Sequence, residues 1–181
     1  MYIETERLIL RRWNRTDAFM LSEINSEPDV MLSLGRGVMS VEDACNNIVT
    51  FEEHFERHGF GLWAVERKYD LSLIGLCGLR IVSNNEYSFA PCTEISWVQK
   101  RELWGNGYMT EAAIASIEDG FQRVKIKKIY SWTAQVNYRS QNLMRRAGMH
   151  REEKLDFDHP RLPVGHPLSR HLVYLINAPK V

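Results

Sequence analysis

Two glycines, one residue apart, stand where a strand pattern gives way to a helix pattern. The segment reads Trp104-Gly105-Asn106-Gly107-Tyr108-Met109-Thr110-Glu111-Ala112. Glycine has no Cβ, so the backbone can curl there and bring its N–H groups close to an anion. The helix that follows begins with unpaired N–H groups and a partial positive charge. The segment therefore predicts a cradle for the diphosphate of a cofactor.

Other phosphate-binding and metal-binding patterns fit the chain less well. A P-loop requires Gly-Lys-Ser/Thr after its glycines, and a dinucleotide-binding fold requires a third glycine at a set spacing; neither occurs here. Cys45, Cys77 and Cys92 lie far apart and form no CxxC pair, so no zinc site is expected. We interpret them as reduced thiols of a cytoplasmic protein and expect no metal.

The bulk composition is that of an ordinary folded domain. The chain has 181 residues, 44% of them apolar, which suits a single domain over residues 1–181. Lys plus Arg and Asp plus Glu both number 23, whereas a duplex-binding protein normally carries a basic excess. We therefore expect no nucleic-acid partner. No apolar run approaches the roughly 18 residues of a membrane span, and the first residues do not resemble a secretory leader.

Hydrophobic periodicity predicts a mixed α/β fold with about seven strands and about four helices. The predicted strands cover residues 3–13, 62–66, 73–83, 93–98, 128–134, 149–155 and 170–176. The predicted helices run from Thr16 to before Pro28, from a Ser40–Asp43 capping box to Gly59, from Met109 to Val124, and from Asn137 to Ala147. A loop over 156–169 joins the last two strands. The glycine pair thus follows the fourth strand and precedes the third helix.

Four segments in this order resemble the GNAT superfamily of acyl-CoA-dependent N-acyltransferases, and within it the RimJ/RimL-type branch. They are Glu4-Thr5-Glu6-Arg7-Leu8-Ile9-Leu10-Arg11, Glu94-Ile95-Ser96-Trp97, the glycine segment, and Asn137-Tyr138-Arg139-Ser140 followed by Met144-Arg145-Arg146-Ala147-Gly148-Met149. The resemblance covers nearly the whole chain. It implies a twisted, mostly antiparallel sheet that splays between its fourth and fifth strands.

The resemblance also implies that acetyl-CoA sits in this splay. Its pantetheine arm would bond to the edge of residues 94–98, and its pyrophosphate would rest on the backbone of residues 103–109. The family's usual Gln or Arg before the first glycine is replaced by Glu102, so Arg101 is expected to supply the compensating charge. The predicted cofactor residues are Trp97, Val98, Arg101, Leu103, Trp104, Gly105, Asn106, Gly107, Tyr108, Met109, Asn137 and Ser140.

The same resemblance suggests catalytic roles. Glu94 is the candidate base or water-wire anchor, although a carboxylate with a pKa of about 4 is a weak base unless burial raises it. The family's Tyr acid corresponds to Met144, which cannot donate a proton. Ser140 is the alternative acid and Tyr138 the next, or no acid is needed because a thiolate leaves readily. A backbone N–H near Trp97 or Val98 is expected to bind the oxyanion.

The acceptor is predicted to be a primary amine, on a protein N-terminus or a small molecule. An α-amine with a pKa of about 7.8 is roughly 10% neutral at pH 7, and a lysine amine is far less so, which slightly favours the α-amine. The family places its acceptor wall at Phe60, Trp63, Phe157, Asp158 and His159, beside Glu94. Dimers are common in the resembled family. Two rival hypotheses are a non-catalytic acyl-CoA sensor and a nucleotide-binding regulatory domain.

Overall fold

The structure is a computed structural model that describes residues 1–28, 30, 38–83, 87–163 and 165–180. Within these residues nine strands form one sheet in the order β1-β2-β3-β4-β5-β6-β9-β7, with β8 paired to β9. All neighbours are antiparallel except β5 and β6. The elements are β1 (Tyr2–Glu4), β2 (Leu8–Arg11), α1 (Ala18–Ile24), α3 (Val41–His58), β3 (Leu62–Arg67), β4 (Ser72–Val82), β5 (Cys92–Gln99), α4 (Tyr108–Gln122), β6 (Lys128–Ala134), α5 (Tyr138–Arg146), β7 (His150–Arg151), β8 (Phe157–Asp158) and β9 (Arg170–Asn177).

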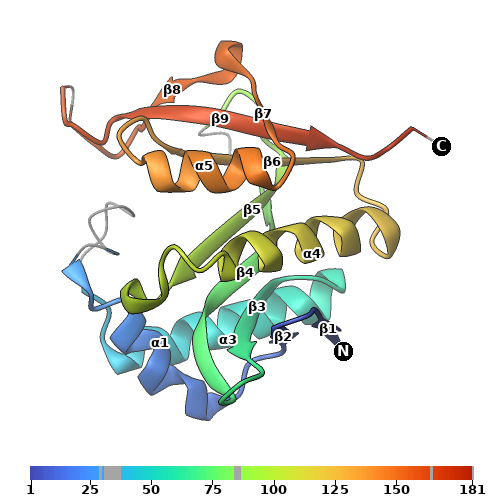
Figure 1. Cartoon of the computed structure of the whole chain (residues 1–181). Coiled ribbons are helices and arrows are strands. Elements are labelled where there is room, and N and C mark those ends of the chain that lie inside the picture. The colour runs from blue at the N-terminus through green and yellow to red at the C-terminus, as the bar shows by residue number, and fades with distance from the viewer. Residues whose placement is uncertain (29, 31–37, 84–86, 164, 181) are drawn as a thin grey trace.

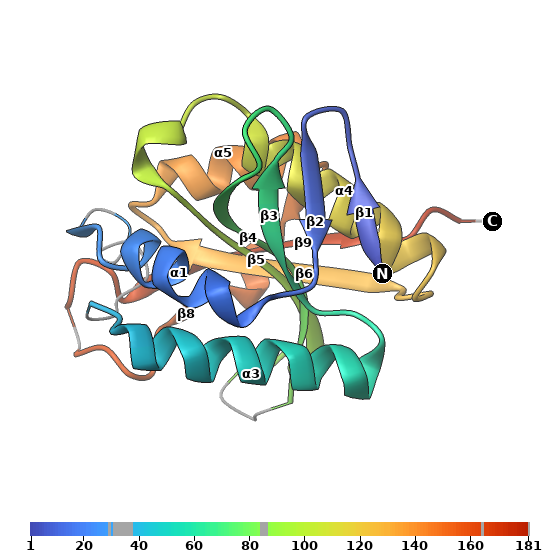
Figure 2. The same ribbon diagram turned by 90° about the horizontal axis from the view of Figure 1, so that it is seen from below.

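The helices cover both faces of the sheet (Figure 1, Figure 2). On one face, α4 and α5 pack through residues such as Ala112, Ile117 and Met144. On the other face, α1 and α3 pack through residues such as Leu21 and Ala44. The mixed α/β class, the mostly antiparallel sheet and the four predicted helices are confirmed. The sheet has more strands than the seven expected.

The predicted helix boundaries rest on local capping chemistry. Ser40 Oγ accepts from the Asp43 amide at 3.0 Å, and the Asp43 carboxylate accepts from the Ser40 amide at 3.1 Å, so α3 begins with the expected capping box. Gly59 ends α3 with φ +73°. No helix in the described part of the chain is both long and apolar enough to cross a bilayer.

The single first strand predicted over 3–13 is wrong, because the chain forms a hairpin of β1 and β2 there. The Thr5 amide donates to the Leu8 carbonyl at 3.0 Å, and the Thr5 hydroxyl accepts from the Leu8 amide at 3.0 Å. These bonds close a turn while the alternation of apolar and polar residues continues through it. Periodicity alone therefore could not reveal the turn.

The last strands also differ from the prediction. The expected strand over 149–155 is reduced to β7, because a 3-10 turn forms at Glu153–Leu155. Asp156 fixes this turn: its carboxylate accepts from the Val173 amide at 3.0 Å and pairs with Arg151. The predicted loop 156–169 begins with β8, which pairs with β9. The loop is thereby attached to the sheet at its first residues.

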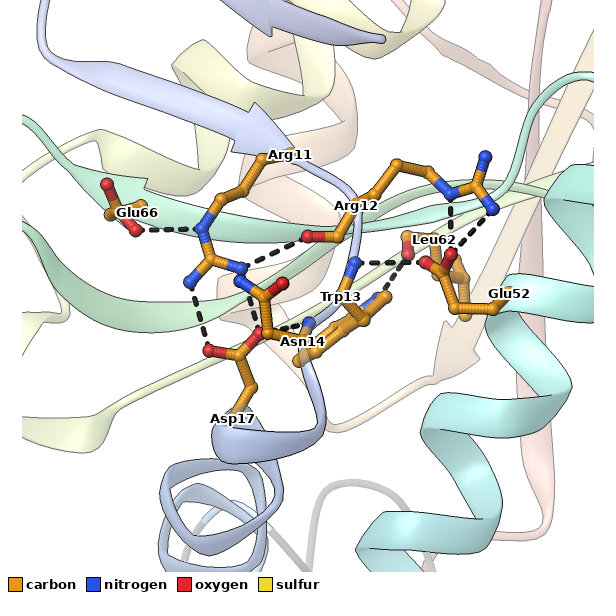
Figure 3. A network of polar contacts seen from close by, with 8 residues as sticks. All are labelled: Arg11, Arg12, Trp13, Asn14, Asp17, Glu52, Leu62 and Glu66. Atoms are coloured by element: carbon orange, nitrogen blue, oxygen red, sulfur yellow. Dashed lines mark hydrogen bonds and ion pairs between the residues drawn. The ribbon is translucent and has the colours of Figure 1, made fainter.

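A polar network joins the first strands to the start of α1 (Figure 3). Arg11 contacts Asp17 and Glu66, each at 2.8 Å, and these carboxylates, Asp17 first, raise the pKa of the guanidinium. The Trp13 indole donates to the Leu62 carbonyl at 2.6 Å in the buried interior. β2, β3 and α1 are therefore held together as one unit, and this unit supports one side of the site described next.

Candidate active site

The sheet splays between β5 and β6, as predicted. The two strands run parallel, and Glu94 with Tyr130 is the one pair between them in the described part of the chain. Next to this pair, the Ser131 hydroxyl donates to the Ile95 carbonyl at 3.0 Å. Beyond it, no ladder pairing joins the two strands within the described residues. The edge of β5 toward Gln99 is therefore open to an added hydrogen-bonding partner.

The glycine loop leads from this open edge to α4. Gly105 and Gly107 have φ of +84° and +79°, a conformation that favours glycine. The Trp104 indole donates to the Gln99 carbonyl at 3.1 Å and holds the loop against the end of β5. The backbone amides of residues 105–110 donate no hydrogen bond to any described residue. They are therefore donors of the kind that the predicted diphosphate cradle requires.

A second set of contacts fixes the loop to the N-terminal hairpin. The Glu111 carboxylate accepts from the Thr5 hydroxyl at 2.6 Å and from the Arg7 amide at 2.9 Å, and it pairs with the Arg7 guanidinium at 2.6 Å. Arg7 also donates to the Asn106 carbonyl at 3.0 Å and lies 4.6 Å over the Tyr108 ring. Burial opposes ionisation of Glu111, but these hydrogen bonds outweigh it and lower its pKa. The loop is therefore preorganised before any ligand binds.

The first turn of α5 forms the facing wall. Asn137 caps the helix by accepting from the Ser140 amide at 3.2 Å. The Arg139 guanidinium lies 4.5 Å over the Trp104 ring, so α5 and the glycine loop meet there. Both Ser140 and Met144 line the space between the two sides of the splay, but Met144 is only 1% exposed and belongs to the core.

The space enclosed is a cleft of about 950 Å³ lined by both sides of the splay. Eight predicted cofactor residues line it: Trp97, Val98, Trp104, Gly105, Gly107, Met109, Asn137 and Ser140. Four others belong to the same loop but lie outside the lining that the described residues form: Arg101, Leu103, Asn106 and Tyr108. Tyr138 also lies outside the lining and is 68% exposed.

Glu94 lines the cleft and is buried, but its carboxylate is not alone. The Arg80 guanidinium on β4 lies directly opposite in the register and donates to the carboxylate at 2.6 Å. A guanidinium at this distance stabilises the charged carboxylate and weakens it as a proton acceptor. Arg80 was not among the predicted site residues, although the two charged residues occupy neighbouring predicted strands.

His171 is a cleft residue that sequence reasoning missed. Its Nδ1 lies 3.0 Å from the Ser169 carbonyl, and a carbonyl can only accept, so Nδ1 carries the proton. Its ring stacks on Phe157 at 5.4 Å. Burial lowers the pKa of His171; the Ser169 carbonyl opposes this, and neighbouring His159 adds to it. Nε2 has no hydrogen-bond partner among the described residues. Every fully buried side-chain nitrogen in this part of the chain has such a partner, so Nε2 is not fully buried and is accessible.

Two of the predicted acceptor residues lie in the core. Phe60 and Trp63 are only 6% and 2% exposed, and neither is among the described residues that line the cleft. The Trp63 ring centroid lies 4.4 Å from that of Phe55. Packing in the core accounts for both aromatic side chains, so we do not assign either residue to the acceptor-binding wall.

The predicted residues of the 156–169 loop lie nearer to the site. His159 lines the cleft, 5.0 Å from His171 between ring centroids. Phe157 does not line it but packs behind Tyr87, with 4.8 Å between their centroids. Asp158 is exposed and pairs with Arg170 at 3.6 Å. The loop therefore brings His159 to the cleft and supports it with Phe157.

Known proteins share this sequence pattern and this fold. A model of the "Acetyltransferase (GNAT) domain" matches residues 7–150. The uncharacterized N-acetyltransferase YnaD of Bacillus subtilis is 28% identical over 152 residues, 84% of each chain. A GNAT-family acetyltransferase from Bacillus anthracis superposes with a TM-score of 0.78 and 26% identity over 98% of both chains. RimL, a ribosomal L7/L12 α-N-protein acetyltransferase in complex with coenzyme A, superposes with a TM-score of 0.80 at 16% identity, again over 98% of both chains.

Proposed function

The chain belongs to the GNAT acetyltransferase family, and on this premise we propose that it transfers the acetyl group of acetyl-CoA to a primary amine. The observation that carries the proposal is the open edge of β5, which ends at the unpaired amides of residues 105–110. An extended arm that ends in a diphosphate matches both features at once. The amine attacks the thioester directly, and CoA thiolate leaves.

The residues that would hold acetyl-CoA follow from the geometry. The amides of residues 105–110 would bind the pyrophosphate, and the edge at Trp97 and Val98 would bind the pantetheine arm. Asn137 would contact the arm from the opposite wall while it caps α5. When bound, acetyl-CoA supplies an activated acyl group. A backbone amide of Trp97 or Val98 would stabilise the oxyanion, which contributes about 10²–10³ in rate.

Direct transfer is favoured over an acylated cysteine. Burial raises the pKa of Cys77 to about 12, and burial with the nearby charge of Glu94 raises that of Cys92 to about 11. Both therefore remain protonated at neutral pH and are poor nucleophiles. No cysteine is among the described residues that line the cleft. The cleft thus offers no thiolate to carry the acetyl group.

We propose that His171, rather than Glu94, accepts the proton that the attacking amine loses. The Glu94 carboxylate is held by Arg80, whereas Nε2 of His171 is accessible. Its lowered pKa keeps the imidazole neutral at pH 7, as a general base must be before it takes a proton. Glu94 retains a role in holding Arg80 and in orienting water. Ser140, which lines the cleft, donates its hydroxyl proton to the thiolate and regains one from solvent, in preference to the exposed Tyr138.

The test is CoA thiol release from acetyl-CoA in the presence of peptide N-termini, monoamines, polyamines and aminoglycosides. The proposal predicts that release requires an amine, that acetylated amine forms in equal amount, and that Gly107→Trp abolishes both. Tight binding of acetyl-CoA without transfer to any amine would contradict the proposal and support a sensor. Displacement of CoA by ATP at similar concentration would support a nucleotide-binding domain.

A further inference from the structure

The face of the cleft opposite α4 and α5 contains a group of apolar side chains. It is lined from α1 and α3 by Leu21 and Phe51, and from β3 and β4 by Leu62 and Leu76. Asn25 at the end of α1, and Asn47 and Thr50 on α3, add uncharged polar groups. An acceptor that enters on this face therefore meets apolar carbon and uncharged polar groups on the side of the first four strands. Such a surface favours an acceptor with an apolar body.

The other side of the same face is aromatic. Trp132 on β6 and Tyr87 both line the cleft, with 5.0 Å between their ring centroids. Phe157 lies behind them, 4.8 Å from Tyr87 and 6.4 Å from Trp132. These contacts fix the rings in place before an acceptor arrives. A preformed pair of aromatic side chains suits a flat apolar ligand, which can stack on the rings or meet their edges.

The charges of the cleft discriminate against polycations. Among the described residues that line it, Glu94 carries the one carboxylate, and Arg80 already pairs with that group at 2.6 Å. The same lining contains three more guanidinium groups, those of Arg139, Arg146 and Arg161. An ion pair with a second or third ammonium group would need a further carboxylate, which the described lining does not supply. Additional positive charges on the acceptor therefore gain no ion pair in this lining.

We propose that the acceptor is a monoamine with an aromatic body, which lies against Trp132 and Tyr87 while its amino group reaches the thioester. The inference rests on the proposed acetyl transfer and adds the substrate class. The same chemistry is presented by a small arylalkylamine and by a peptide whose N-terminal residue is aromatic. Polyamines and aminoglycosides are poor acceptors because they bring several positive charges into the cleft.

The experiment compares kcat/KM for matched acceptors at saturating acetyl-CoA. The acceptors are phenethylamine, a peptide with N-terminal Phe, the same peptide with N-terminal Ser, and spermidine. We expect the kcat/KM for phenethylamine or for the Phe peptide to exceed that for spermidine by at least about tenfold. The ratio of kcat/KM between phenethylamine and the Phe peptide shows whether the acceptor is a small amine or a peptide. A higher kcat/KM for spermidine or for the Ser peptide would overturn the inference and leave the proposed function standing. No acetylation of any amine would overturn both.

A matched pair of variants tests the position of the acceptor. Trp132→Leu should raise KM for the aromatic amine about five- to tenfold, because it removes an aromatic contact but keeps an apolar side chain. Tyr130→Leu is the control, since Tyr130 lies on the same strand and stacks on Phe89 at 5.4 Å but is not among the described lining residues. Equal effects of the two variants on KM, or no effect of Trp132→Leu, would overturn the inference. The Kd for CoA should be unchanged in both.

Discussion

The glycine loop yields the sharpest prediction, because the chain contains its own control. Gly105, Gly107 and Gly59 have φ of +84°, +79° and +73°. An added Cβ would meet nothing within 4 Å at Gly105 or Gly59, and only an Arg7 nitrogen at 3.6 Å at Gly107. Replacement by alanine therefore creates the same backbone strain at all three sites without a steric clash. Only Gly105 and Gly107 line the cleft among the described residues.

The magnitude follows from two opposing terms. A left-handed backbone conformation costs an alanine about 1–2 kcal/mol. Alanine also reduces the conformational entropy of the unfolded chain, which stabilises the folded protein by about 0.4–1 kcal/mol. Each variant should lose roughly 1 kcal/mol of unfolding free energy, or about 2–4 °C in Tm. The affinity for CoA should distinguish the variants at Gly105 and Gly107 from the variant at Gly59. Alanine keeps the backbone N–H, but at Gly105 or Gly107 its methyl group would hinder the close approach of the diphosphate to the backbone. Loss of one charge-assisted hydrogen bond in this way is worth about 1.5–3 kcal/mol, which raises Kd roughly 10- to 100-fold.

Thermal unfolding and calorimetric titration with CoA test this directly. We expect similar Tm shifts for Gly59→Ala, Gly105→Ala and Gly107→Ala, with weakened CoA binding in the two loop variants alone. Wild-type affinity in both loop variants would refute the diphosphate cradle. Equal loss of affinity in Gly59→Ala would show that general destabilisation, rather than the loop, controls binding.

Three further perturbations test the site. His171→Gln should lower kcat about 100-fold without changing the Kd for CoA. In the wild type, activity should fall as pH drops through the lowered pKa of His171, where the imidazole becomes charged; a pH–rate profile of the variant that keeps this acidic limb would contradict the assignment. Ser140→Ala should reduce kcat by about ten- to a hundredfold with an unchanged KM for acetyl-CoA, and a wild-type kcat would exclude Ser140 as the acid. Glu111→Gln should lose about 1–3 kcal/mol of stability. Because the folded pKa of Glu111 is depressed, its contribution is present above about pH 4.3 and is lost as pH falls, so denaturant unfolding of the two proteins should converge in acid. A difference in stability that does not change with pH would count against the ion pair.

The elements that could be predicted are those whose chemistry is local. The capping box at Ser40 and the left-handed glycine at Gly59 lie next to the helix ends that they set. The buried face of α4 follows helical spacing: Met109, Ala112 and Ile117, which are three to five residues apart in the sequence, are all buried. In these places the neighbours that decide the structure are a few residues away in the chain.

The features that were missed depend on distant partners. The turn at Thr5 is completed by Glu111, which is 106 residues away in the sequence. The role of Arg80 depends on the strand register, which places it opposite Glu94. His171 reaches the cleft because β9 pairs with both β6 and β8, and no local pattern marks it. Opposite charges in two adjacent predicted strands could have indicated the Arg80 pair, whereas His171 carried no such signal.

The most direct test of acetyl transfer is a single-turnover experiment with the protein in excess over labelled acetyl-CoA. Mass spectrometry of the quenched mixture follows the label with and without phenethylamine or the Phe-initiated peptide. We predict that the label moves to the amine, only when the amine is present, and never accumulates on the protein. Label that remains on CoA in the presence of every amine, or label on a protein side chain, would contradict direct transfer.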